Sequence, residues 1–332
     1  REIKGDAWYE EWFQAQYART PADLRLLVNV VWRAGATDGV LRLLCDAIKA
    51  HPIDDQLADA LGYGRWYGEV SQEGLRELLQ ELITQDKYVS TVTVLHERIT
   101  LRAHEIDWWE ELALGVVMNV GLIHDMHNYA SFHWKEVVEK YLDKHASKIV
   151  GRIFEAHMNQ SKGYRAFDHY AEQIVKQALE IDSLGVWREL SAKLENPDMA
   201  YLFTLGFPDR IVDALPHDKI ITWIDRDPKI RAPLFARLVK LDFRSDETLA
   251  SKILGQFGEL ETVRDSFGAA FSSGMWSGTW SGHWNALAAS LELVAERTSF
   301  DKLRSWAIEK AADLRLQAER DSIRDEEDDL PR

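Results

Sequence analysis

Apolar residues recur at intervals of three and four positions along almost the whole chain, and this spacing places them on one face of an α-helix. The first clear example follows Thr20-Pro21, where Thr can cap a helix and Pro fits its first turn. Similar segments begin at Thr37 or Asp38 and at Ser71. The chain has no sustained alternation of apolar and polar residues with a period of two. We therefore expect an all-α protein.

The predicted helices are short and are joined by short polar turns, which favours stacked antiparallel helix pairs. Three times in the C-terminal half, an acidic residue stands shortly before an apolar-Arg pair in a predicted helix. The arginines are Arg231, Arg264 and Arg304, which are 33 and 40 positions apart. A period of about 40 residues with two helices per unit is typical of HEAT and armadillo repeats. We predict a HEAT/armadillo-like α-solenoid with a less regular helical region at 1–160, helical repeats at 161–316 and an acidic, fraying tail at 317–332.

The charge balance changes which partners are plausible. The chain has 40 Lys and Arg residues against 55 Asp and Glu residues, a formal net charge of −15 at pH 7. Binding to a nucleic-acid backbone depends on clustered cations that release counterions, so this balance argues against nucleic acid as the main partner. It suits a protein partner that has a basic face.

Cysteine content and the chain start bear on the cellular compartment. Cys45 is the only cysteine, which excludes an internal disulfide framework and fits a reducing cytosol. Its neighbours in a predicted amphipathic helix are apolar, so we expect a small core residue and not a nucleophile. The chain opens with Arg1 and has no secretory leader, which predicts a cytoplasmic fragment. The longest mostly apolar run, Leu112 to Ile123, contains Asn119 and is too short to span a bilayer.

Tryptophan is abundant, with 13 residues in the chain. Trp-rich segments either fill helix–helix seams or form binding surfaces, and both interpretations stay open. Trp276, Trp280 and Trp284 lie four positions apart in a Gly- and Ser-rich segment, so they form either an aromatic platform or a packed turn held by Trp306. The candidate contacts for a protein partner are Trp66, Tyr67, Trp108, Trp109, Trp276, Trp280 and Trp284.

An alternative function is a metal-dependent phosphohydrolase of the HD type. His96 is followed by His124-Asp125, and imidazoles and a carboxylate from neighbouring helices can hold a divalent ion that activates water. A separate possibility is zinc held by His124, His127 and His133. The opposing interpretation is that these histidines cap helices or bond to nearby carbonyl groups. We expect no cofactor in the principal interpretation.

A third possibility is an oligomerisation module. The segment around Trp8, Tyr9, Trp12, Phe13 and Tyr17 is aromatic at helical spacing. It predicts either a first core helix or a face that packs on another subunit, together with the acidic C-terminal helix. Large exposed apolar patches would favour the second interpretation.

Several stretches of the C-terminal half carry a family resemblance. They are Ile220–Pro228, Arg231–Pro233, Phe271–Gly278 and Leu303–Ala307. On these residues, the block from Val186 to Asp329 resembles the C-terminal helical-repeat region of large bacterial NACHT/STAND-type and related anti-phage defence proteins. The resemblance implies a helical array that senses a foreign, often phage, protein. The chain lacks the Gly-x4-Gly-Lys-Ser/Thr motif of the nucleotide-binding core of such proteins.

Together these patterns predict a protein-binding sensor or scaffold that is not itself catalytic. The resemblance implies that its activity lies elsewhere in a longer polypeptide. The expected partner is a foreign or phage protein, or upstream domains of the same polypeptide, bound on the concave surface of the solenoid. We expect neither a nucleic acid nor a membrane as the main partner.

Overall fold

A computed structural model describes residues 5–19, 23–62, 64, 66–125, 129–159, 168–196, 208–271 and 279–328. These residues form eighteen α-helices and two short 3₁₀ turns, and no strand occurs among them. The prediction of an all-α protein is therefore confirmed. Within the same described ranges, no helix is both long and apolar enough to cross a membrane.

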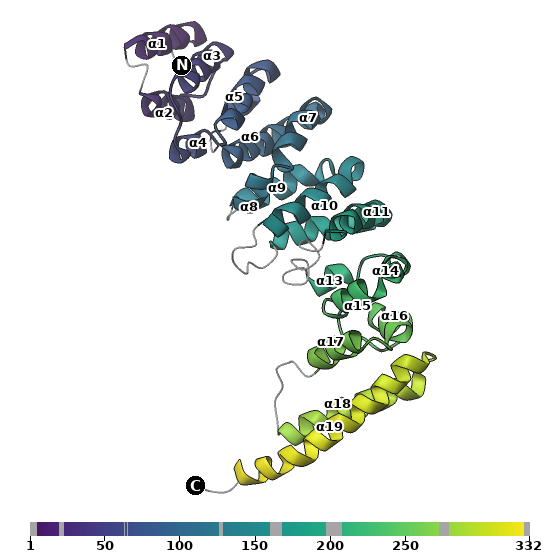
Figure 1. Cartoon of the computed structure of the whole chain (residues 1–332). Helices are drawn as coiled ribbons and strands as arrows, with labels where there is room; N and C mark the ends of the chain where they lie inside the picture. The colour runs from purple at the N-terminus through teal and green to yellow at the C-terminus, as the bar shows by residue number, and fades with distance from the viewer. Residues whose placement is uncertain are drawn as a thin grey trace. The chain divides into compact units, whose positions relative to one another are not determined.

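The chain divides into two compact units (Figure 1). Unit 1 contains Arg1–Gly163 and Asp168–Asp182, and unit 2 contains Tyr164–Phe167 and Ser183–Arg332. The division falls at a kink in helix α11 (His169–Leu194), where Asp182 has the non-helical angles φ −144° and ψ 68°. Each unit has its own buried core.

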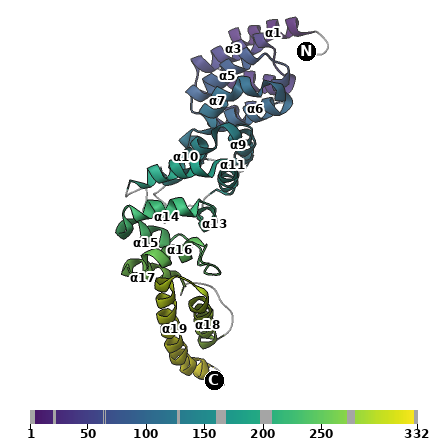
Figure 2. The same ribbon diagram turned by 90° about the vertical axis from the view of Figure 1, so that its right-hand side faces the viewer.

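Unit 1 is built from helices, and those from α1 to α6 alternate between two rows. The helices are α1 (Asp6–Arg19), α2 (Leu24–Ala34), α3 (Asp38–Ala50), α4 (Asp55–Gly62), η1 (Trp66–Gly68), α5 (Gln72–Thr84), α6 (Tyr88–Leu101), η2 (Ala103–Glu105), α7 (Ile106–Val117), α8 (Val120–Asp125), α9 (Tyr129–Glu139), α10 (Leu142–Asn159) and the first part of α11. Helix α1 packs on α3 and α3 on α5, whereas α2 packs on α4, α4 on α6 and α6 on α9. Figures 1 and 2 show α1, α3 and α5 side by side.

Polar side chains join each helix of a row to the next. Tyr9 of α1 donates to the Gly35 carbonyl, 2.8 Å away, just before α3, and Asp38 of α3 accepts from the Ser71 N–H at 2.8 Å, just before α5. In the other row, Ser90 of α6 donates to Asp59 of α4 at 3.0 Å. These bonds connect residues 26, 33 and 31 positions apart. Hydrogen bonds between neighbouring helices therefore hold each row of helices together.

Side-chain caps start several of these helices. Thr37 accepts from the Val40 N–H at the start of α3, and Ser71 accepts from the Gly74 N–H at the start of α5. Both caps were among those predicted. Helix α2 begins at Leu24 and is capped by Asp23, while the predicted cap at Thr20-Pro21 lies outside the described residues.

The core of unit 1 contains the residues expected to be structural. Cys45 is 1% exposed in α3, which agrees with its prediction as a core residue. On α1, Tyr9 and Phe13 are buried, whereas Trp8 is 39% exposed and stacks on Trp12 with ring centroids 6.5 Å apart. Helix α1 is thus a core helix that also leaves one aromatic face in contact with solvent.

Unit 2 continues with shorter helices and ends in a long hairpin. Its elements are the rest of α11, α13 (Asp209–Val212), α14 (His217–Asp225), α15 (Pro228–Ala236), α16 (Leu249–Phe257), α17 (Glu261–Phe271), α18 (Trp280–Arg297) and α19 (Asp301–Asp328). Helices α18 and α19 pack on each other along their length, and α16 packs on α19. Helix α19 continues as helix through most of the segment predicted as a fraying tail, up to Asp328.

The three arginines of the predicted repeat join helices to one another. Arg231 of α15 donates to the Trp223 carbonyl in the last turn of α14 at 2.9 Å. Arg304 of α19 donates to the Thr298 carbonyl just after α18 at 2.6 Å. Both contacts satisfy carbonyl groups at the end of the preceding helix. Arg264 of α17 instead pairs with Glu309 of α19.

Candidate functional site

The loop residues Trp66 and Tyr67 are core residues in the structure. They are 3% and 0% exposed, and their rings lie 4.3 Å apart. The Tyr67 hydroxyl donates to the Leu61 carbonyl, and Arg98 of α6 donates to the Tyr67 carbonyl. Burial explains the aromatic loop, so these side chains are not part of the contact surface proposed below.

Trp108 and Trp109 have different environments although they are adjacent. Trp109 is 0% exposed and its indole N–H donates to Glu105 at 3.2 Å. Trp108 is half-buried, and the Arg76 guanidinium of α5 lies 5.3 Å from its ring centroid. Trp109 belongs to the core, and Trp108 joins α5 to α7.

The Gly- and Ser-rich segment is only partly described. Trp276 lies outside the described residues. Trp280 is 38% exposed and Trp284 is 8% exposed, with their ring centroids 6.1 Å apart on α18. The Trp284 N–H donates to Asp321 of α19 at 2.8 Å, so this ring packs the hairpin, and Trp280 is the more exposed of the two.

Not all histidines of the predicted metal sites can be located in the structure. His124 and Asp125 belong to α8, but their side chains are not described, and His127 is outside the described residues. The hydrolase hypothesis with His96, His124 and Asp125, and the zinc hypothesis with His124, His127 and His133, therefore stay predictions. The structure instead brings His96 of α6 beside His133 of α9, with ring centroids 4.5 Å apart.

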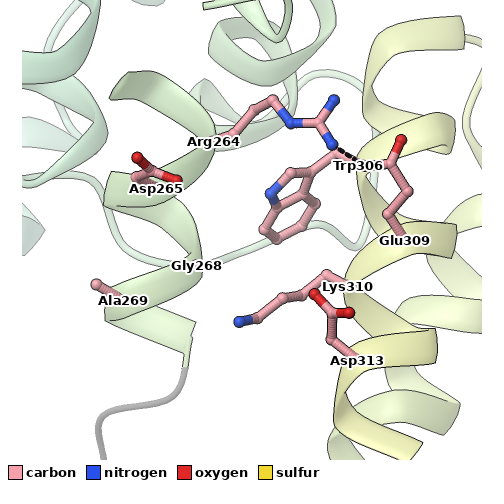
Figure 3. A pocket seen from close by; sticks show the side chains of 8 residues that line it. All are labelled: Arg264, Asp265, Gly268, Ala269, Trp306, Glu309, Lys310 and Asp313. Carbon is pink, nitrogen blue, oxygen red and sulfur yellow. Dashed lines mark hydrogen bonds and ion pairs between the residues drawn. The ribbon is translucent and has the colours of Figure 1, made fainter. Parts of the chain in front are cut away.

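A groove of about 370 Å³ lies between α17 and α19 (Figure 3). Its lining residues are Arg264, Asp265, Gly268, Ala269, Trp306, Glu309, Lys310 and Asp313. Helix α17 contributes the first four of these residues, and α19 contributes the last four. The groove is a surface of unit 2 alone.

Trp306 forms the floor of the groove, and other aromatic rings pack behind it. Trp306 is 3% exposed, and its ring centroid lies 5.7 Å from that of Phe243 and 6.3 Å from that of Phe267. Phe271 contacts the same indole at 6.3 Å. Because these rings interlock, the floor holds the spacing between α17 and α19.

The rim of the groove carries one ion pair and three further charged side chains that have no partner among the described residues. Arg264 pairs with Glu309 across one end of the groove. Lys310 reaches toward α17, so that a methyl group on Gly268 would lie 3.6 Å from its Nζ. Within the described part of the chain, the side chains of Lys310, Asp265 and Asp313 form no hydrogen bond or ion pair. These three charges are available to an incoming molecule.

The sequence does not predict this groove, although two of its lining residues had drawn attention for other reasons. Arg264 stood out as a repeat position, and Trp306 as a possible packing partner of the Trp-rich segment. Asp265, Lys310 and Asp313 gave no signal, because single charges on a helix surface are usually solvated. No family model, curated protein or solved structure matches the chain.

Proposed function

We propose that the chain is a helical-repeat module that binds a protein partner, and that the groove between α17 and α19 is part of its contact surface. The observation that carries the proposal is this groove, because it combines a rigid aromatic floor with unpaired charges on its rim. A groove of fixed shape with charged side chains on its rim can recognise a partner segment by shape and by charge, as the core and polar rim of a protein contact site do.

The packing of unit 1 supports a repeat architecture of the HEAT/armadillo-like solenoid type. From α1 to α6, a helix packs on the second helix after it, and hydrogen bonds within unit 1 join residues 26 to 40 positions apart. When each repeat contacts only its neighbours, the array offers long surfaces to a partner. Such arrays act as scaffolds and sensors without a catalytic centre of their own.

Charge favours a basic segment as the occupant of the groove. The whole chain carries −15, and the unpaired groups of the rim are two carboxylates and one ammonium. A Lys or Arg side chain of a partner can pair with Asp265 or Asp313, and a partner carboxylate can pair with Lys310. The partner we propose is a foreign, for example phage, protein or an upstream domain of the same polypeptide that presents such a segment.

A selection experiment tests the proposal while the partner is still unidentified. The purified full chain is immobilised, and a random peptide library displayed on yeast is selected for binding. We expect enriched peptides that are rich in Lys and Arg and contain at least one acidic residue. The matched control is the Asp265→Asn/Asp313→Asn variant, which removes the two rim carboxylates and keeps the aromatic floor.

Two outcomes contradict the proposal. One is that no peptide family is enriched on the wild-type chain. The other is that the same families are enriched equally on the double variant, because the rim would then have no role in recognition.

A further inference from the structure

Two imidazoles and a carboxylate meet on the surface between α6 and α9 of unit 1. His96, Glu97 and His133 each offer one ligand atom, and these atoms all lie within 4.8 Å of one another. The His96 and His133 rings are stacked with an angle of 16° between their planes. The two histidines of the set come from two different sites that the sequence predicted, and Glu97 belongs to neither.

The hydrogen bonds of Thr93 determine which nitrogen of His133 carries the proton. The Thr93 hydroxyl donates its only hydrogen to the Val89 carbonyl at 3.0 Å. The same oxygen lies 3.1 Å from His133 Nδ1, so in this contact it must accept and Nδ1 must donate. In the neutral ring, Nε2 then has a free lone pair. Metal-binding histidines are commonly oriented by a hydrogen bond of this kind from their other nitrogen.

His96 presents a nitrogen whose bonding capacity is unused. Its Nδ1 is buried and, within the described part of the chain, has no hydrogen-bond partner. The nearest carboxylate oxygen is Glu97 Oε1, at 3.8 Å, which is too far for a hydrogen bond. Leaving a buried polar atom unpaired destabilises a protein by about 1–3 kcal/mol, so such atoms call for an explanation.

The surroundings keep both rings neutral and favour a cation between them. Burial lowers the pKa of His96 and, together with the neighbouring His96, that of His133. Glu97 and Glu136 act on both rings from nearby, and Lys140 is the opposing charge near His96. Phe132 lies edge-on to both imidazoles at 6.0 and 5.9 Å, which supplies an apolar border.

We propose that His96, Glu97 and His133 form a binding site for a divalent transition-metal ion of the Zn²⁺ type. Two imidazole nitrogens and one carboxylate oxygen are a ligand set that Zn²⁺ accepts, with a further position open to water. Zn–N bonds of about 2.0–2.1 Å hold two nitrogens at most about 4.2 Å apart. The lone pair of an imidazole nitrogen lies in the plane of its ring, and the two ring planes are nearly parallel, so binding must tilt the rings toward a common point as well as draw the three side chains closer. The ion then satisfies the unpaired nitrogen of His96 and links α6 to α9.

The test is a calorimetric titration of ZnCl₂ into the full chain after treatment with a chelator. We expect one equivalent of Zn²⁺ to bind, and a melting temperature that rises with Zn²⁺ but not with Mg²⁺, which prefers oxygen ligands. His96→Ala and His133→Ala should each weaken binding at least tenfold. His104→Ala is the matched control, since that imidazole is 73% exposed and outside the set, and should leave binding unchanged.

Variants of Thr93 distinguish a metal site from a pair of histidines that only stabilises the packing of α6 on α9. Thr93→Val removes the hydroxyl that orients His133 and should weaken Zn²⁺ binding about tenfold, whereas Thr93→Ser should keep it. Circular dichroism checks that each variant is folded. The proposal is overturned if wild-type chain binds no Zn²⁺, or if binding survives in His96→Ala and His133→Ala but is lost in His124→Ala/His127→Ala.

Discussion

Arg98 and Glu105 form a buried two-pronged ion pair in unit 1, with Nε to Oε2 at 2.7 Å and Nη2 to Oε1 at 2.9 Å. The remaining arginine nitrogen donates to the Val70 carbonyl at 3.0 Å, and Glu105 also accepts from Trp109. The two side chains are 3% and 8% exposed. The pair therefore ties α6 and α7 to the loop that contains Trp66.

Removing one member of this pair should strongly destabilise unit 1. Arg98→Met leaves the Glu105 carboxylate buried without its counter-ion, and we expect a loss of about 3–5 kcal/mol in the free energy of unfolding. The double variant Arg98→Met/Glu105→Leu should recover part of that loss. Denaturant unfolding followed by circular dichroism measures both changes. A single variant as stable as wild type would contradict this account of the core.

Acid should weaken the same pair. Burial raises the pKa of the Glu105 carboxyl, but hydrogen bonds from Arg98 and Trp109 and the Arg98 charge lower it more, so that it lies below the usual 4.5. The folded state then binds fewer protons than the unfolded state as the pH falls below 4.5, and stability falls with the pH in that window.

The measurement is the unfolding midpoint of unit 1 at a series of pH values above and below that window. We expect a smaller loss on acidification in Arg98→Met/Glu105→Leu than in wild type, because the variant has no carboxyl at this position. Equal slopes in the two proteins would show that Glu105 does not contribute to acid sensitivity.

Replacing two glycines with alanine should change the free energy of unfolding in opposite directions. Gly115 lies in α7 with nothing within 4 Å of an added Cβ, so Gly115→Ala should stabilise unit 1 by about 0.5–1 kcal/mol. In α16, a Cβ on Gly255 would overlap the ring of Phe300, so Gly255→Ala should destabilise unit 2 by about 1–3 kcal/mol. Denaturant titration of the two variants checks the signs, and the same sign for both would be the failing result.

Cys45 should react with alkylating reagents only after unit 1 opens. Burial raises the pKa of its thiol to about 12, with the Glu77 charge as a smaller cause. At pH 8 the thiol is then almost entirely protonated in the folded chain, and the protonated thiol is a poor nucleophile. Iodoacetamide labelling, followed by mass spectrometry, should be far slower in native than in unfolded protein, and faster in Arg98→Met. Equal native and unfolded rates would place the thiol at the surface.

The sequence predicted those features of the fold that depend on residues close to one another along the chain. The caps Thr37 and Ser71 and the core position of Cys45 follow from side-chain chemistry and helical spacing within a few residues. Arg231 and Arg304, noted for their spacing, do make the same kind of contact with a preceding helix end.

Features that depend on distant partners could not be predicted. Tyr67 is buried, and Arg98, which lies 31 positions later in the chain, donates to its carbonyl; the sequence of the loop does not predict that contact. The sequence does not predict that His96 lies beside His133, because only the packing of α6 on α9 brings the two rings together. The groove charges were missed for the same reason, because α17 and α19 meet only through tertiary packing.

The most direct test of the central claim is the affinity of the most enriched basic peptide for wild-type chain and for Asp265→Asn/Asp313→Asn, measured by fluorescence anisotropy. The account predicts a loss of about five- to thirtyfold, since two exposed ion pairs together contribute about 1–2 kcal/mol. The control, Glu11→Gln/Glu73→Gln, removes the same charge from exposed positions of unit 1 and should bind like wild type. Equal losses in both double variants would mean that only net charge matters, and would contradict binding in the groove.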